Sequence, residues 1–205
     1  MMTRKLVVIS AGLRQPSSTR LLADRVAAAT VRELTTLGID TEVEVIEVRD
    51  HGHELVNNLL VGYPSEDLET VLGRVAAADG LIAVTPTFSA SYNGLFKMFF
   101  DVLDDQALVD KPVLVAATGG TGRHSMVLDH ELRPLFSYLR ATVVPTGVFA
   151  GPEDWAGGEE AGESLARRID RAAVQLARAI AQREPARVAD PFAVPLSFEQ
   201  LLAEG

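Results

Sequence analysis

The sequence predicts an α/β domain in which helices cover both faces of a doubly wound parallel sheet. Two observations support this fold class. Short runs rich in β-branched residues, typical of strands buried on both faces, alternate with segments whose apolar residues recur at helical spacing. This strand-helix unit occurs five times with short connections, which requires a parallel sheet because each helix crosses back over one face. No internal repeat or low-complexity linker divides the chain.

The elements of the first half each have their own signal. The first strand is an unbroken β-branched run, the first helix stops at Gly38, and the second strand alternates polar and apolar residues as an edge or near-edge strand does. Ser65 opens the second helix, and Pro86 stops the third strand. Residues 49–64 are ambiguous, with a short helix at 55–60 as one option. The expected elements are strand 6–9, helix 18–37, strand 42–48, helix 65–78 and strand 80–84.

The second half continues the alternation. Its first helix is apolar around nearly its whole circumference, and Pro134 could kink the next one. Beyond Pro185 a tail with two further prolines is expected to lie on the surface or on another subunit, so that the domain spans residues 1–185 and the tail 186–205. The expected elements are helix 92–103, strand 113–117, helix 124–139, strand 141–148 and helix 159–183.

Composition excludes several other classes of protein. The chain has 205 residues, 47% of them hydrophobic and 23% charged, as in globular domains rather than disordered chains or coiled coils. It contains no cysteine, which excludes disulfides, thiolate metal sites and a cysteine nucleophile. The formal net charge of -9 disfavours nucleic acid and anionic membranes as partners. No apolar run has the length of a membrane span or a signal peptide, so we expect a cytoplasmic protein.

The candidate ligand site lies in three loops. In an open doubly wound sheet, ligands bind beyond the carboxyl ends of the strands, where the strand order reverses. The loops after the first, third and fourth strands are 10–19, 86–93 and 118–124, and all three are rich in Gly, Ser, Thr and Pro. The four histidines are too scattered for a metal cluster, and no metal site is expected.

The first loop leads from a buried strand directly into a helix. A helix N-terminus offers unpaired amides and the positive end of the helix dipole, and both suit a phosphate. Four hydroxyls and Arg14 add donors there, although Ser17, Ser18 and Thr19 could equally serve only as helix caps. Neither Gly-x-x-x-x-Gly-Lys-Ser/Thr nor Gly-x-Gly-x-x-Gly follows the first strand. This disfavours a nucleoside triphosphatase and a Rossmann dinucleotide site.

The other two loops suit a flat ligand. The loop after the third strand combines Phe88 and Tyr92 with several hydroxyls, a composition that fits an aromatic ring with polar edges. Phe88 could instead belong to the core. The glycines of 119–122 would let the backbone approach such a ring closely, or would form an ordinary tight turn.

Together these loops resemble the NADPH-dependent FMN reductase family, which has a flavodoxin-like fold. The first loop of that family, Gly-Ser-x-Arg-x-x-Ser-x-Asn, is similar to residues 12–19, where Arg14 and Ser17 match and Thr19 stands in the Asn position. Its Thr-Pro-Glu-Tyr-Asn signature resembles residues 85–91, with Thr, Phe and Ser at the last three signature positions. Residues 94–97 echo its Gly-Leu-x-Lys stretch and 118–120 its glycine turn. The resemblance covers about residues 4 to 150.

The resemblance implies a five-stranded sheet of order 2-1-3-4-5 in three α/β/α layers, and an NAD(P)H-dependent FMN reductase. It implies that the first loop holds the FMN phosphate, the second lines the isoalloxazine ring, and the glycine turn contacts the pyrimidine end. Arg14 is alternatively a ligand of the nicotinamide cofactor's phosphates. No catalytic side chain is implied, because the flavin performs the hydride transfer. The implied FMN-binding residues are Ser10, Arg14, Ser17, Thr19, Pro86, Thr87, Phe88, Ser89, Ser91, Thr118, Gly119 and Gly120.

The resemblance also implies partners: NADPH or NADH as electron donor, a homodimer or homotetramer, and a luciferase-like, flavin-dependent monooxygenase that receives the reduced FMN. The helix over 92–103 independently favours an oligomer, because its apolar surface exceeds the single stripe that packing on a sheet requires. The alternative is that neighbouring helices and segment 49–64 cover it. Other interpretations of the chain are a quinone or azo reductase with bound FMN, a flavodoxin-type electron carrier, and a flavin-binding module without turnover.

Overall fold

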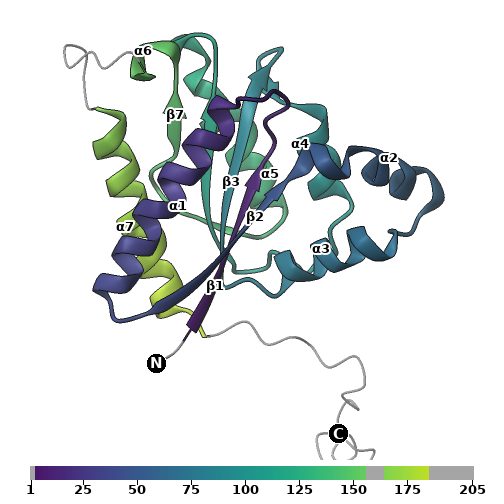
Figure 1. The fold of residues 1–205 in the computed structure, drawn as a ribbon, viewed down its shortest axis with the longest axis horizontal. Coiled ribbons are helices and arrows are strands. Elements are labelled where there is room, and N and C mark those ends of the chain that lie inside the picture. The colour runs from purple at the N-terminus through teal and green to yellow at the C-terminus, as the bar shows by residue number, and fades with distance from the viewer. Residues whose placement is uncertain (1–2, 156–163, 185–205) are drawn as a thin grey trace, which may run out of the picture.

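The computed structural model describes residues 3–155 and 164–184 (Figure 1). The strands are β1 (Thr3–Ser10), β2 (Asp40–Glu47), β3 (Gly80–Phe88), β4 (Ser91–Tyr92), β5 (Pro112–Thr118), β6 (Thr142–Val143) and β7 (Val148–Ala150). The α-helices are α1 (Ser18–Thr36), α2 (Gly52–Val61), α3 (Glu66–Ala76), α4 (Gly94–Asp101), α5 (Arg133–Tyr138), α6 (Pro152–Trp155) and α7 (Leu165–Gln182). Two 3₁₀ segments, η1 (Val48–His51) and η2 (Gly122–Met126), and a π-helical segment, η3 (Leu128–Leu132), complete the described elements.

The sheet has the strand order expected for a flavodoxin-like fold. Strands β2, β1, β3, β5 and β6 lie side by side in that order, all parallel, and β7 also pairs with β5. Strand β4 is a two-residue antiparallel addition to β3. When β4 is set aside and β6 and β7 count as one position, the order is 2-1-3-4-5. The predicted order and fold class are confirmed, with β2 at the edge.

Helices cover both faces of the sheet in three layers. Helices α1 and α7 pack on one face, and α3, α4 and α5 pack on the other (Figure 1). Successive side chains of a strand point to opposite faces, so Leu6 and Val8 of β1 join the α1–α7 core while Val7 and Ile9 join the other. Chain order reverses between β1 and β3, which places a ligand site beyond their carboxyl ends.

Strand β3 does not stop at Pro86 as the sequence predicted; it runs on to Phe88. Pairing with β1 ends at Val84, while pairing with β5 continues to Pro86. On the β1 side the strand therefore has no partner at Pro86, and the missing proline amide costs no ladder hydrogen bond there. The strand then turns back as β4, which the sequence analysis did not foresee.

The last predicted strand and helix are both subdivided. The strand expected at 141–148 consists of β6 and β7, separated near Pro145, and Arg133 donates hydrogen bonds to the carbonyls of Val144 and Pro145 in between. The helix expected at 124–139 passes through η2 and η3 before α5. The amide of Arg133 bonds to the carbonyl of Leu128, five residues earlier, so the expected distortion at Pro134 is a wide π turn just before the proline.

The helix predicted over 92–103 is α4, and its apolar residues are covered by the same chain. Phe96, Phe99 and Phe100 are buried, and the ring of Phe100 lies 4.9 Å from that of Phe136 in α5. Helix α2, formed from the ambiguous segment 49–64, packs against α4. These residues therefore do not by themselves require a second subunit. Of the helix expected at 159–183, α7 is described; residues 159–163 and the tail 186–205 lie outside the described residues.

Candidate functional site

The loops predicted to bind a ligand meet at the carboxyl edge of the sheet. They line a cleft of about 350 Å³, to which the ends of β3, β5 and β7 contribute. Five of the twelve predicted site residues line it directly. The lining residues are Ser18, Pro86, Thr87, Thr118, Gly119, Gly120, Ala150, Pro152 and Trp155.

The sequence analysis missed the wall of this cleft that follows β7. Ala150, Pro152 and Trp155 form it, and the guanidinium of Arg25 in α1 lies 5.1 Å from the centre of the Trp155 ring. Such cation–π contacts orient an indole. The one tryptophan of the chain, directly after a strand end, was the available signal.

The hydroxyls of the first loop combine capping with a possible ligand role. Ser17 is the N-cap of α1, and its Oγ accepts a hydrogen bond from the amide of Arg20 at 3.1 Å. The hydroxyl hydrogen of Ser17 is not used in that bond. Ser18, at the first helical position, is exposed and lines the cleft. The capping interpretation is thus correct for Ser17, and it leaves the hydroxyl hydrogen of Ser17 available as a donor.

Thr19 joins the first loop to the glycine turn. Its Oγ1 lies 2.8 Å from Oγ1 of Thr118, and both side chains are buried. One hydroxyl hydrogen suffices for this bond, so the pair retains a second hydrogen for an outside acceptor. The contact couples the position of the α1 N-terminus to the end of β5.

The two arginines of this region differ in availability. Arg20 bonds to Asp24 at 2.8 Å and to Glu47 at 2.7 Å, and these hydrogen bonds raise its pKa. Its charge is therefore already compensated. Arg14 is exposed, and within the described residues it forms no hydrogen bond or ion pair. Arg14 is the cation of the loop that remains free for an anionic ligand.

Ser10 and Thr87 carry buried hydroxyls without partners. The Ser10 side chain is completely buried at the end of β1, and its Oγ has no hydrogen-bond partner among the described residues; the same holds for Oγ1 of Thr87. Buried polar atoms normally have hydrogen-bond partners. A polar ligand group that bonded to either hydroxyl would therefore remove the free-energy cost of leaving it unpaired. Ser10 lies behind the loop rather than on its surface.

The β3–β4 hairpin projects beside the cleft. Ser89 and Ala90 have φ values of 48° and 68°, the left-handed conformation that two-residue hairpin turns need and that glycine or asparagine usually supplies. Phe88 is 49% exposed, so it is not a core residue. Ser91 donates to a carboxylate oxygen of Glu131 at 2.8 Å, which ties the hairpin to η3. The turn is held in a conformation that its residues do not favour.

Asn93 is a structural residue of the site that the sequence analysis missed. It is 2% exposed, and its Nδ2 donates to the carbonyl of Ala11 in the first loop at 2.6 Å. Its Oδ1 accepts from the amide of Phe96 at 2.8 Å and so caps α4, while its own amide bonds to Thr85 at 3.3 Å. One side chain therefore links the first loop, the end of β3 and α4. The only signal for this role in the sequence was an asparagine, a common N-cap residue, directly before the glycine that begins α4.

The two glycines of this turn, Gly119 and Gly120, have different surroundings: packing requires a glycine at 119, whereas position 120 is open. A Cβ on Gly119 would lie 2.7 Å from the Phe149 ring and 3.2 Å from Cβ of His124, whereas a Cβ on Gly120 would meet nothing. The Gly119 amide bonds to the carbonyl of Ala150 at 3.1 Å. The backbone is thus pressed against the protein at Gly119 and accessible from the cleft at Gly120, which suits close approach of a flat ring.

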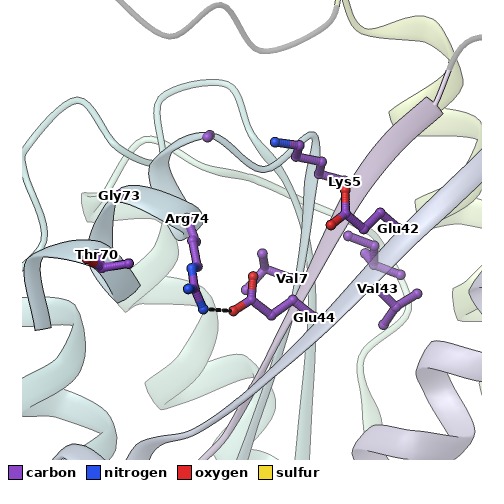
Figure 2. Close-up of a pocket in the computed structure, with 10 residues that line it drawn as sticks. Lys5, Val7, Glu42, Val43, Glu44, Thr70, Gly73 and Arg74 are labelled. Atoms are coloured by element: carbon purple, nitrogen blue, oxygen red, sulfur yellow. Dashed lines mark hydrogen bonds and ion pairs between the residues drawn. The ribbon is translucent and has the colours of Figure 1, made fainter. Parts of the chain in front are cut away.

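A larger cavity, of about 580 Å³, lies away from the carboxyl ends of the strands, between β1, β2 and α3 (Figure 2). Its charged lining residues have both signs, and Arg74 pairs with Glu44 across it. Glu42 and Glu44 would repel a phosphate, and no loop of the sheet's carboxyl edge reaches it. The smaller cleft therefore remains the candidate site. Within the described residues no group of three His, Asp or Glu side chains could hold a metal ion, and no helix could cross a membrane.

Comparisons with known proteins show which family and which proteins this chain is similar to. The family model for NADPH-dependent FMN reductase matches residues 4–156. The chain is 41% identical to FMN reductase (NADPH) of Pseudomonas aeruginosa, over 84% of this chain and 90% of that protein. It is 39% identical to the NADH-dependent FMN reductase SfnE of Pseudomonas putida, over 82% and 88%. A solved oxidoreductase of Corynebacterium diphtheriae is 47% identical, with a TM-score of 0.86 over 90% of this chain and all of that one.

Proposed function

The chain belongs to the NADPH-dependent FMN reductase family, and from this premise we propose that it reduces FMN in the cleft at the carboxyl edge of the sheet and releases it to a separate monooxygenase. The chain is an NAD(P)H:FMN oxidoreductase that uses NADPH or NADH. Bound FMN supplies the hydride-accepting ring, so the protein has to bind and orient both cofactors without an acid, base or nucleophile of its own.

The first loop is assigned to the FMN phosphate. The N-terminal amides of α1, the free hydroxyl hydrogen of Ser17 and the second hydrogen of the Thr19–Thr118 pair supply neutral donors. Arg14 supplies an exposed positive charge in a chain whose net charge is -9. The orphan hydroxyl of Ser10 lies behind these groups.

The second loop and the glycine turn are assigned to the flavin ring. Pro86, Thr87, Gly119, Gly120 and Trp155 all line the cleft. Phe88, Ser89 and Ser91 belong to the hairpin beside it and hold its shape through the contact of Ser91 with Glu131. The buried hydroxyl of Thr87 has no other partner among the described residues and suits a polar edge of the ring.

The exposure of the surrounding loops supports release of the reduced product. Ser18, Gly120 and Pro152, which line the cleft, are all exposed, so the cleft is open to solvent within the described residues. An electron carrier keeps its flavin bound through many turnovers, and an enclosed site favours such tight binding. A flavin that is passed to another enzyme has to leave the protein in each turnover. The open cleft favours the second arrangement, and it is the observation that carries the proposal.

A transfer assay tests this proposal. The purified protein, NADPH and FMN are mixed with a luciferase-like monooxygenase and its substrate, and product formation is followed together with the loss of nicotinamide absorbance. We expect product that depends on FMN. In a parallel anaerobic mixture without the monooxygenase, we expect NADPH to reduce more FMN than the reductase itself can bind. If only the bound FMN were reduced there, the reduced flavin would stay on the reductase, and the proposal would be contradicted.

We also propose that the chain forms a symmetric homo-oligomer through α2. Val56, Leu59 and Leu60 recur at three- and four-residue spacing and so share one face of this helix, and they are 40%, 47% and 79% exposed. Val61 and Tyr63, 56% and 70% exposed, add apolar surface at the C-terminal end of the helix. Leu55 and Asn58, on the adjacent side of α2, are buried by the same chain. A second copy that presents the same patch would cover this surface, because a two-fold axis pairs like with like.

Leu60→Glu should dissociate the oligomer. Each copy of a symmetric interface loses a buried leucine and gains a charge, so we expect the dissociation constant to rise about a hundredfold. Analytical ultracentrifugation over a concentration series measures it. Leu37→Glu, at an exposed leucine beyond α1, is the matched control and should leave assembly unchanged. An unaltered sedimentation profile for Leu60→Glu would place the interface elsewhere.

A further inference from the structure

A second, basic pocket adjoins the flavin cleft and is not explained by FMN binding. It encloses about 120 Å³ and is formed by the tip of the hairpin and by η2 and η3. It shares no residue with the first loop, which is assigned to the FMN phosphate. The lining residues are Ala90, Arg123, His124, Met126, Val127, His130 and Glu131.

The pocket is in direct contact with the floor of the cleft. A Cβ added to Gly119 would lie only 3.2 Å from Cβ of His124. His124 therefore packs directly against the glycine turn. Ala90 is the second residue of the strained hairpin turn, whose first strand lines the cleft. A ligand that spans both sites therefore needs to cross only the edge of the hairpin.

The basic side chains of this pocket have free hydrogen-bonding groups. Among the described residues, the side chains of Arg123 and His130 form no hydrogen bond or ion pair, and the buried Nδ1 of His124 has no partner. Asp129 pairs with Arg133 at 2.8 Å, whereas Glu131, which itself lines the pocket, accepts a hydrogen bond from the neutral hydroxyl of Ser91 at 2.8 Å and keeps its charge. An arginine and two histidines thus line the pocket with Glu131 as its acidic residue, and within the described residues none of the three forms an ion pair with a carboxylate, in a chain of net charge -9.

This chemistry suits a phosphate. Arginine offers a planar set of N–H donors that matches phosphate oxygens, and imidazole N–H groups donate in either tautomer. The reaction brings two anionic ligands to one protein, FMN and a nicotinamide dinucleotide, and the dinucleotide must place its ring against the flavin. Its phosphates therefore need a cationic site that is close to the cleft and separate from the first loop.

We propose that Arg123, His124 and His130 form the site that binds the phosphates of the nicotinamide dinucleotide. The proposal rests on the reductase function and specifies how the electron donor is recognised. It makes Arg123 the principal determinant of dinucleotide affinity, since Arg123 carries a permanent charge. Two phosphate groups of the dinucleotide could occupy this site: the 2′-phosphate, which only NADPH has, and the pyrophosphate, which NADPH and NADH share.

Steady-state kinetics of Arg123→Gln and His130→Gln, with NADPH and with NADH at saturating FMN, tests the proposal. We expect Arg123→Gln to raise KM about tenfold or more, the effect of losing a hydrogen bond to a charged group, and to change kcat little. A rise with NADPH alone identifies the 2′-phosphate as the ligand, and an equal rise with both donors identifies the pyrophosphate. Calorimetric binding of NADP⁺ to the same variants should weaken in parallel.

Two controls separate this site from the rest of the protein. Arg178→Gln, at an exposed arginine on α7, makes the same substitution elsewhere and should leave KM unchanged. The dissociation constant for FMN alone, measured by flavin fluorescence, should not change in Arg123→Gln. Unaltered KM values with both donors, or weakened FMN binding, would overturn the proposal. Failure of the reductase function itself would appear separately, as a wild-type protein without FMN-dependent NADPH oxidation.

Discussion

Asn93→Asp is expected to weaken FMN binding at least about tenfold and to lower the free energy of unfolding by about 2–3 kcal/mol. The substitution keeps the size of the side chain and the oxygen that caps α4. It replaces the Nδ2 donor, 2.6 Å from the carbonyl oxygen of Ala11, with a second oxygen. Two oxygens then face each other in a site that is 2% exposed, where an unpaired polar group is costly.

The effect on FMN follows from what Asn93 connects. Ala11 begins the loop assigned to the FMN phosphate, and Thr85 precedes the segment assigned to the ring. Repulsion at Ala11 therefore displaces the first loop relative to the second. Fluorescence titration with FMN and urea unfolding measure the two effects. Asn93→Ser is the control: serine also caps helices, so it should preserve α4 and lose only the bond to Ala11. Full FMN affinity in Asn93→Asp would show that the two loops are positioned independently.

Asp79→Ala is expected to lower the free energy of unfolding by about 3–5 kcal/mol without a direct effect on FMN affinity. Asp79 precedes β3 at the amino end of the sheet. Its Oδ1 accepts from Arg4 at 2.9 Å, its Oδ2 accepts from the amide of Lys5 at 2.8 Å, and both charged side chains are less than a tenth exposed. Removing the carboxylate leaves the buried guanidinium of Arg4 without its counter-charge.

The reason that Asp79 affects stability rather than binding is its position. Arg4 also donates to the carbonyl of Arg183 at 2.6 Å, so the ion pair joins β1, β3 and the end of α7, at the opposite end of the strands from the cleft. Urea unfolding measures the loss. The double variant Arg4→Met, Asp79→Leu should recover much of it, because no unpaired charge remains buried. A single variant as stable as wild type would mean that solvent reaches Arg4 when the pair is broken.

Helices and strands could be predicted from the sequence where their signals are local. Ser17 and Ser65 cap α1 and α3 as N-terminal serines do, and Gly38 adopts the left-handed φ of 75° beyond α1. Propensity, periodicity and capping act between residues a few positions apart, so a linear pattern contains them. The predicted end of β3 at Pro86 was wrong because the cost of a proline depends on which neighbouring strand is present at that point, a property of the sheet.

The sequence itself determined the fold class and, through the family resemblance, the strand order. It also determined the three loops of the cleft, since parallel strands bring their carboxyl ends to one edge of the sheet. The tertiary structure alone decided which side chains of those loops are free. Thr19 meets Thr118, and Asn93 meets Ala11, across 99 and 82 residues of chain. The burial of α4 by α2, the wall at Trp155 and the pocket around Arg123 likewise arise from packing between segments that are distant in sequence. Hydrogen-bond partners and burial are set by such contacts, and no local pattern encodes them.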